Sequence, residues 1–166
     1  FAQSAAEMTA WLTARYGIAA DFKDHSGLSD QTRITAGDMV RVLVADGPDG
    51  ALAPLLKEIG MRDDEGNFVS DYPAEVHAKT GTLNFVSTLA GYVETAHGDD
   101  LAFAIFAGDI DRREAAKAIG DEVPAGSITY NTRAKRLQQD LLQRWGLSSG
   151  VSPQHRPVGP VDLPAP

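Results

Sequence analysis

Three strand-like segments that follow one another closely place the tightest constraint on the fold of this chain. They run from Glu75 to Leu83, from Ser87 to Thr95 and from Leu101 to Gly108. Only a few residues connect them, and connections this short join neighbouring antiparallel strands. The sequence therefore predicts an antiparallel meander. Because residues 101–107 are almost wholly apolar, we expect the last strand to be covered on both faces.

Apolar residues recur at helical spacing before and after this meander. The spacing predicts a helix from about Ser4 to Tyr16, opened by a capping box, a second from Thr35 to Gly47, and a last one from about Asn131 to Trp145. The inward positions expected on the last helix are Ala134, Leu137/Gln138, Leu141/Leu142 and Trp145. The fold class predicted is α/β of the layered α+β kind, an antiparallel sheet flanked by helices.

The remaining segments are predicted to be short turns, loops and a tail. Residues 51–60 suggest a short helical turn, and residues 62–67 are polar enough to form an exposed loop. Asp109 and Asp111 resemble a carboxylate pair, but a helix entry explains them more simply. We expect one structural unit over residues 1–146, followed by a Pro-, Gly- and Ser-rich tail at 147–166.

The bulk composition narrows the range of partners. The chain has 166 residues and a formal net charge of −8, which argues against a nucleic-acid partner, because nucleic-acid surfaces need clustered Lys and Arg. It contains no cysteine, so disulfides and thiolate metal sites are excluded. No apolar run is long enough for a membrane span. The four histidines do not form a metal-ligand set, and we expect no metal ion and no cofactor.

The segment Lys79-Thr80-Gly81-Thr82, within the first predicted strand, has the most distinctive chemistry. An ammonium group, two hydroxyls and a glycine on one strand edge suit the binding of an extended peptide that ends in a carboxylate. The alternative is a surface strand with a solvated lysine and two threonines that favour β structure. The tripeptide K-T-G alone is short enough to occur by chance.

The order of the motifs is more specific. A helix, the loop Asp24-His-Ser-Gly-Leu-Ser29, a capped helix, and then residues 78–83 running into Leu89-Ala-Gly-Tyr92 resemble the class C low-molecular-mass penicillin-binding proteins, which are D-alanyl-D-alanine carboxypeptidases and endopeptidases. K-T-G is one of three signatures of such serine enzymes, with S-x-x-K and S-D-N. Neither of the other two occurs here. The resemblance therefore implies a carboxy-terminal fragment of a penicillin-binding, serine β-lactamase-like transpeptidase fold, inactive alone, whose nucleophile lies upstream of Phe1.

The resemblance also implies roles for individual residues. Lys79 and Thr82 would be catalytic, the lysine through its charge near the nucleophile and the threonine through its backbone N–H as an oxyanion donor. Residues expected to bind substrate are Thr80, Gly81, Leu83, Ser26 and Leu28. For the loop with Ser26 and Leu28 an alternative stays open, a turn with Gly27 at positive φ and Leu28 in the core.

The partners implied by the resemblance are a peptidoglycan stem peptide ending in D-Ala-D-Ala, β-lactams, and the missing amino-terminal part of the same protein. The implied location is the periplasm. Two other functions remain open at this point. The chain could be a non-catalytic module that binds peptidoglycan or protein, or a relative of serine β-lactamases that hydrolyses its acyl-enzyme quickly.

Overall fold

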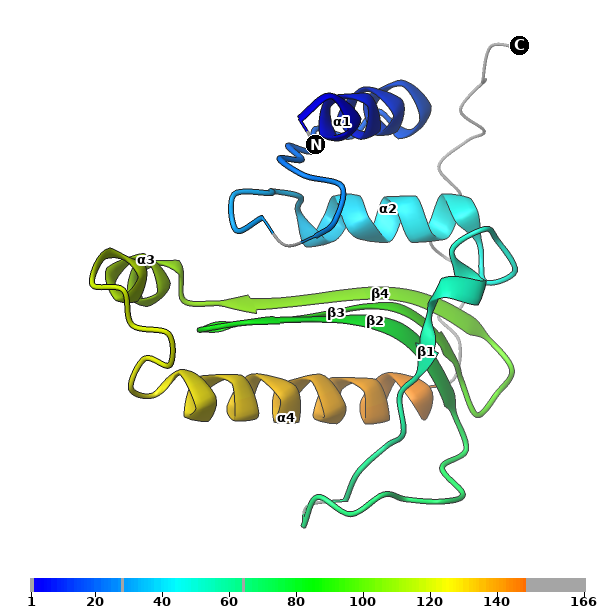
Figure 1. Ribbon diagram of the computed structural model, residues 1–166. Coiled ribbons are helices and arrows are strands. Elements are labelled where there is room, and N and C mark those ends of the chain that lie inside the picture. The colour runs from blue at the N-terminus through cyan, green and yellow to red at the C-terminus, as the bar shows by residue number, and fades with distance from the viewer. Residues whose placement is uncertain (1, 28, 64, 149–166) are drawn as a thin grey trace.

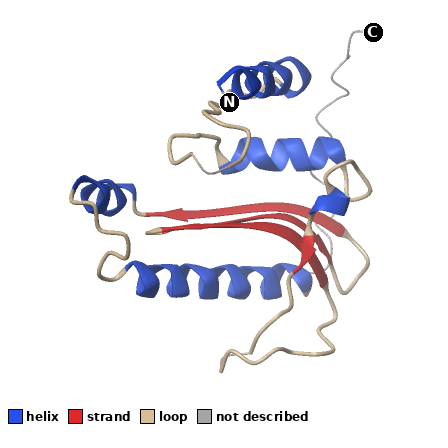
Figure 2. Cartoon of the chain, in the orientation of Figure 1, coloured by secondary structure: helices blue, strands red, loops and turns tan. Residues whose placement is uncertain are grey.

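The computed structural model describes residues 2–27, 29–63 and 65–148 (Figure 1). A central sheet separates helix α2 and, beyond it, helix α1 on one side from helix α4 on the other (Figure 2). The helices are α1 (Ala2–Tyr16), α2 (Ala36–Asp46), the 3-10 turn η1 (Ala53–Leu55), α3 (Ile110–Ala118) and α4 (Ser127–Gly146). The predicted layered α+β class, with an antiparallel sheet flanked by helices, is confirmed. Most of the predicted tail, from residue 149 on, lies outside the described residues.

The sheet has four strands in the order β1-β2-β3-β4, and every neighbouring pair is antiparallel. The strands are β1 (Lys57–Glu58), β2 (Glu75–Leu83), β3 (Val86–Glu94) and β4 (Asp100–Gly108). The three predicted strands are confirmed within one residue at each end. The prediction for residues 51–60 was half wrong, because only η1 is helical and the chain then extends to pair Lys57 with Ala78.

Side-chain caps define the starts of α2 and α3. The Thr35 hydroxyl accepts the Asp38 N–H at the start of α2, and Gly47 ends that helix. Asp109 caps α3 in the same way, as the helix-entry interpretation predicts. The capping box at Ser4 was wrong, since α1 already begins at Ala2.

Helix α4 begins four residues before the predicted Asn131, at the buried Ser127. It lies under the sheet and buries one stripe of side chains at a spacing of four residues, which includes Ala134, Gln138 and Leu142. Of the expected position Leu137/Gln138, Gln138 is the buried residue, and Leu137 lies beside the stripe with half of its surface exposed (50%).

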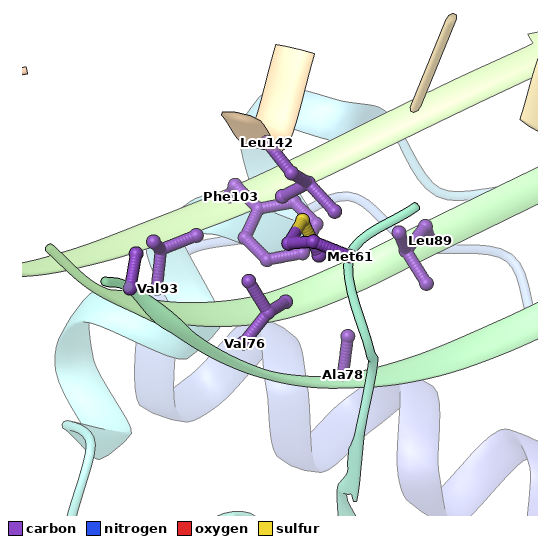
Figure 3. Packing of buried hydrophobic residues seen from close by; sticks show 8 residues of the cluster. Met61, Val76, Ala78, Leu89, Val93, Phe103 and Leu142 are labelled. Atoms are coloured by element: carbon purple, nitrogen blue, oxygen red, sulfur yellow. The ribbon is translucent and has the colours of Figure 1, made fainter. Parts of the chain in front are cut away.

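Two apolar cores stabilise the layers. One lies between the sheet and α4 and includes Val76, Val93, Phe103 and Leu142 (Figure 3). The other lies around α1 and α2 and includes Leu12, Ile18 and Val42. Strand β4 was expected to be covered on both faces, but only Phe103 in it is buried. The expectation was only partly met, because α2 packs against β4 on one face, whereas on the other face α4 packs mainly against β3 and β2.

Candidate functional site

The edge of β2 is open along the Lys79–Leu83 segment. Strand β1 pairs only with His77 and Ala78, so within the described residues no strand continues beside Lys79–Leu83. The Val76 carbonyl accepts the Ile59 N–H across this edge at 2.8 Å. Because backbone groups alternate in direction along an antiparallel strand, Thr80 and Thr82 also direct their N–H and C=O groups out of the sheet. An extended chain could pair with them.

Side chains of the same segment point to opposite faces of the sheet. Val76 and Ala78 lie in the core on the α4 side, so by alternation Thr80 and Thr82 point to that side too. Lys79 lies on the other face, where its ammonium donates to the Thr80 carbonyl at 2.8 Å. Its side chain is exposed, and it does not line the groove described below. The structure therefore separates Lys79 from the two hydroxyls.

The turn after Leu83 holds the end of β2 rigidly. Phe85 has a left-handed backbone, with φ at 58°, which costs free energy for a residue with a side chain. Its ring is buried (2% exposed), contacts Tyr130 edge-to-face at 6.0 Å, and lies 4.4 Å from the Arg112 guanidinium. These contacts offset the backbone cost. The Asn131 amide also donates to the Leu83 carbonyl at 2.9 Å.

The predicted substrate loop around Ser26 forms a compact turn. The Asp24 carboxylate accepts the Ser26 hydroxyl at 2.6 Å and the Ser29 N–H at 2.8 Å. Gly27 has φ at 73°, as the turn interpretation predicts. Leu28 lies outside the described residues, so its predicted role in the pocket or in the core stays a prediction.

A charged network connects this loop with the turn after Leu83. Asp30 pairs with Lys117 of α3 and lies 4.0 Å from Arg113, whose guanidinium donates to the Asn84 carbonyl at 3.2 Å. The hydrogen bond from Lys117 lowers the pKa of Asp30, and the same bond raises the pKa of Lys117. The Ser26 loop and the end of β2 are thus joined through one arginine.

A groove of about 550 Å³ lies on the α4 side of the open edge. Its walls are β2 and β3, one flank of α4, and the loop after Ile59. Residues that line it include Thr80, Thr82, Ser87 and Leu89 of the sheet, Thr132, Lys135, Arg136 and Gln139 of α4, and Arg62, Asp63 and Glu65 of the loop. Of the predicted site residues, the structure therefore brings Thr80 and Thr82 together in one groove. Helix α4, which was not predicted to take part, contributes further residues to this groove.

The loop wall of the groove is fixed to α4. Gln139 accepts the Arg62 N–H at 3.1 Å, and the Gln143 amide donates to the Arg62 carbonyl. Asp63 is held by the Asn67 N–H, and this hydrogen bond lowers the pKa of its carboxyl. The loop is exposed, as predicted, but it was not predicted to form part of a site.

The α4 wall was also missed by the sequence analysis. Thr132, Lys135, Gln139 and Gln143 are polar positions at helical spacing, on the flank next to the buried stripe. At the groove floor, the buried Gln138 amide donates to the Ser87 hydroxyl at 3.2 Å. A polar flank at this spacing is visible in the sequence, but it does not reveal which strand the flank faces.

The described residues contain no group of three or more His, Cys, Asp and Glu side chains that could hold a metal ion. None of their helices combines the length and apolar character needed to cross a membrane.

The chain was compared with known proteins. A model of the D-Ala-D-Ala carboxypeptidase 3 (S13) family matches residues 1–124, which include the loop around Ser26 and the whole of the Lys79–Leu83 segment. Helix α4 follows the matched residues. Neither a curated protein nor a solved structure matches the chain.

Proposed function

The chain belongs to the D-Ala-D-Ala carboxypeptidase 3 (S13) family, and from this premise we propose that it supplies the substrate-binding strand of a serine-type carboxypeptidase acting on peptidoglycan stem peptides. The finer assignment is to the class C low-molecular-mass penicillin-binding proteins. In this proposal the chain is the carboxy-terminal part of the catalytic domain, and the nucleophilic serine comes from a segment outside the printed sequence.

The observation that carries the proposal is the open edge of β2 from Lys79 to Leu83. The backbone groups of Thr80 and Thr82 point outward there, and the edge ends in a turn fixed by Phe85. An extended peptide can add to such an edge by backbone hydrogen bonds. Gly81 has no side chain, so a bound chain can approach the strand closely.

The proposed reaction has two steps. The serine oxygen attacks the carbonyl between the two D-alanines, the C–N bond breaks, and the terminal D-alanine leaves with a proton on its amine. Water then attacks the ester of the acyl-enzyme and releases the shortened peptide and the serine. The Thr82 N–H would stabilise the negative oxygen in both steps, and a donor of this kind is typically worth about 3–4 kcal/mol.

Other residues have supporting roles in this proposal. Lys79, on the opposite face from the Thr80 hydroxyl, would lie on the face that receives the serine and would stabilise negative charge there. Leu83, Ser26 and Leu28 would border the pocket for the substrate side chain. The network from Asp30 through Arg113 to Asn84 supports this, because it ties the Ser26 loop to the end of β2. We further propose that β-lactams acylate the same serine and that the protein acts in the periplasm.

Labelling of the full-length protein with a fluorescent penicillin tests this function. We expect the wild-type protein to form a covalent adduct. Lys79→Ala and Thr80→Val should acylate about tenfold more slowly or worse, because each removes a polar group from the strand that binds the ligand. The measurement is the rate of adduct formation on a gel.

Matched controls are Lys23→Ala and Thr129→Val, which change an exposed lysine and an exposed threonine away from β2. Both controls should label at the wild-type rate. Equal labelling by Lys79→Ala, Thr80→Val and the wild type would remove the role assigned to this strand.

A further inference from the structure

The Thr80 and Thr82 hydroxyls direct a bound carboxylate toward α4. Both side chains point to the α4 side of the sheet and line the groove there, whereas Lys79 lies on the opposite face. A peptide whose free carboxylate reaches these hydroxyls therefore ends at the mouth of the groove. An anion taken out of water needs a cation or several donors near it. The groove offers such a cation among the residues that line it.

Among the described residues, three cations line the groove, and two of them are already engaged. Arg62 donates to the Gly66 carbonyl at 2.6 Å and stacks 3.8 Å from the Phe68 ring. Arg136 also has an interaction of its own. Lys135 makes no hydrogen bond or ion pair with any part of the chain that the structure describes, and its side chain is exposed beside the groove.

The opposite wall disfavours an anion. Asp63 and Glu65 line it from the loop beside Arg62, and the Asn67 hydrogen bond that lowers the pKa of Asp63 favours its ionised form. Their negative charge repels a carboxylate, which is consequently driven to the α4 wall. The helix flank carries Lys135 and Arg136 beside one carboxylate, Asp140, so its net charge is positive, whereas the net charge of the loop wall is negative.

We propose that Lys135 is a specificity-determining residue that binds the free carboxylate at the end of the peptide, together with the hydroxyls of Thr80 and Thr82. The inference rests on the proposed function and adds to it the group that distinguishes a free peptide end from a blocked one. The ammonium of Lys135 forms a charge-assisted hydrogen bond with the carboxylate, and such a bond needs both charges. A peptide with an amide at its end gains nothing from Lys135.

The test uses the full-length protein and two peptides that both end in D-Ala-D-Ala, one as the free acid and one as the primary amide. We expect Lys135→Gln to raise KM for the acid about tenfold and to leave kcat and the turnover of the amide unchanged. Lys135→Arg should retain most of the preference for the acid. Arg133→Gln is the matched control, since Arg133 is an exposed cation of α4 that does not line the groove.

The outcomes separate the inference from the function on which it rests. An unchanged KM for the acid in Lys135→Gln would overturn the inference alone. An equal loss for acid and amide would also overturn it, because that result indicates a structural role. A wild-type protein that releases neither D-alanine from the acid nor D-alaninamide from the amide would refute the proposed function and this inference with it.

Discussion

Neighbouring residues in the Lys79–Leu83 segment have different tasks because a strand alternates the direction of its side chains. Lys79 extends over one face and Thr80 over the other, while Gly81 leaves room beside β3. The sequence of the motif alone does not show that these neighbouring side chains lie on opposite faces of the sheet. The roles proposed here for Lys79 and for Lys135 depend on it, since each serves a different face of the sheet.

Gly81 provides the first test at the residue scale. A Cβ on Gly81 would collide with the hydroxyl of Thr88, which is its partner across the strands. Gly81→Ala should therefore lower the free energy of unfolding by about 1–3 kcal/mol. The double variant Gly81→Ala/Thr88→Ala should recover most of the loss, because it removes the hydroxyl that collides. Urea denaturation of the two variants and of Thr88→Ala measures both effects.

The control is Gly37→Ala in α2, where the nearest atom to a new Cβ is the Thr35 hydroxyl at 3.9 Å. This change should be neutral or slightly stabilising, because alanine favours a helix. If Gly81→Ala proved as stable as the wild type, the close packing of β2 on β3 described here would be wrong.

At the scale of elements, the sequence predicted those parts that local patterns determine. Strands β2, β3 and β4 follow from alternating or continuous apolar runs between turn-forming residues, and α2 follows from its cap at Thr35. Strand β1 was missed because Lys57 and Glu58 are charged, exposed residues without a strand pattern. They are extended only because Ala78 and His77, about twenty residues later, pair with them.

The start of α4 was predicted too late for the same reason, because contacts between residues distant in sequence help to determine it. Its first turn contains the buried Ser127 and is followed by Tyr130, whose contact with Phe85 is not local in sequence. The candidate site was likewise predictable only in part. The motif at Lys79–Thr82 could be found in the sequence, whereas the groove depends on Gln139 reaching Arg62 from 77 residues away. A one-dimensional pattern cannot supply such a contact.

At the scale of the whole molecule, the two cores are connected by polar contacts as well as by packing. The buried Tyr92 hydroxyl of β3 donates to the Leu43 carbonyl of α2 at 2.8 Å. The Asp30 network joins the loop before α2 to α3 and to the turn after β2. We infer that the Ser26 loop and the open edge of β2 keep their positions through Arg113.

This network predicts a pH dependence of stability. The pKa of Asp30 in the folded chain lies below its ordinary value of 3.8, so its contribution is present above about pH 4 and is lost as the pH falls through the lowered pKa. The pKa of Lys117 lies above its ordinary 10.5, so its contribution is lost as the pH rises through that higher pKa. Asp30→Asn should therefore be less stable than the wild type between these limits, and the difference should shrink at both ends.

Denaturation midpoints measured across the pH range check this prediction. Asp71→Asn is the control, because Asp71 is an exposed aspartate in the loop before β2, and its effect should not follow the same profile. If the difference in stability between Asp30→Asn and the wild type stayed constant from acid to alkaline pH, the ion pair would contribute nothing to stability.

The most direct measurement is the position of the acyl carbonyl oxygen in a crystal structure of the full-length protein acylated by a penicillin. The account predicts that this oxygen accepts the Thr82 N–H at about 2.7–3.1 Å, with the rest of the ligand lying along Thr80–Thr82. An acyl group whose oxygen is held by other donors, with the edge of β2 left unpaired, would contradict it.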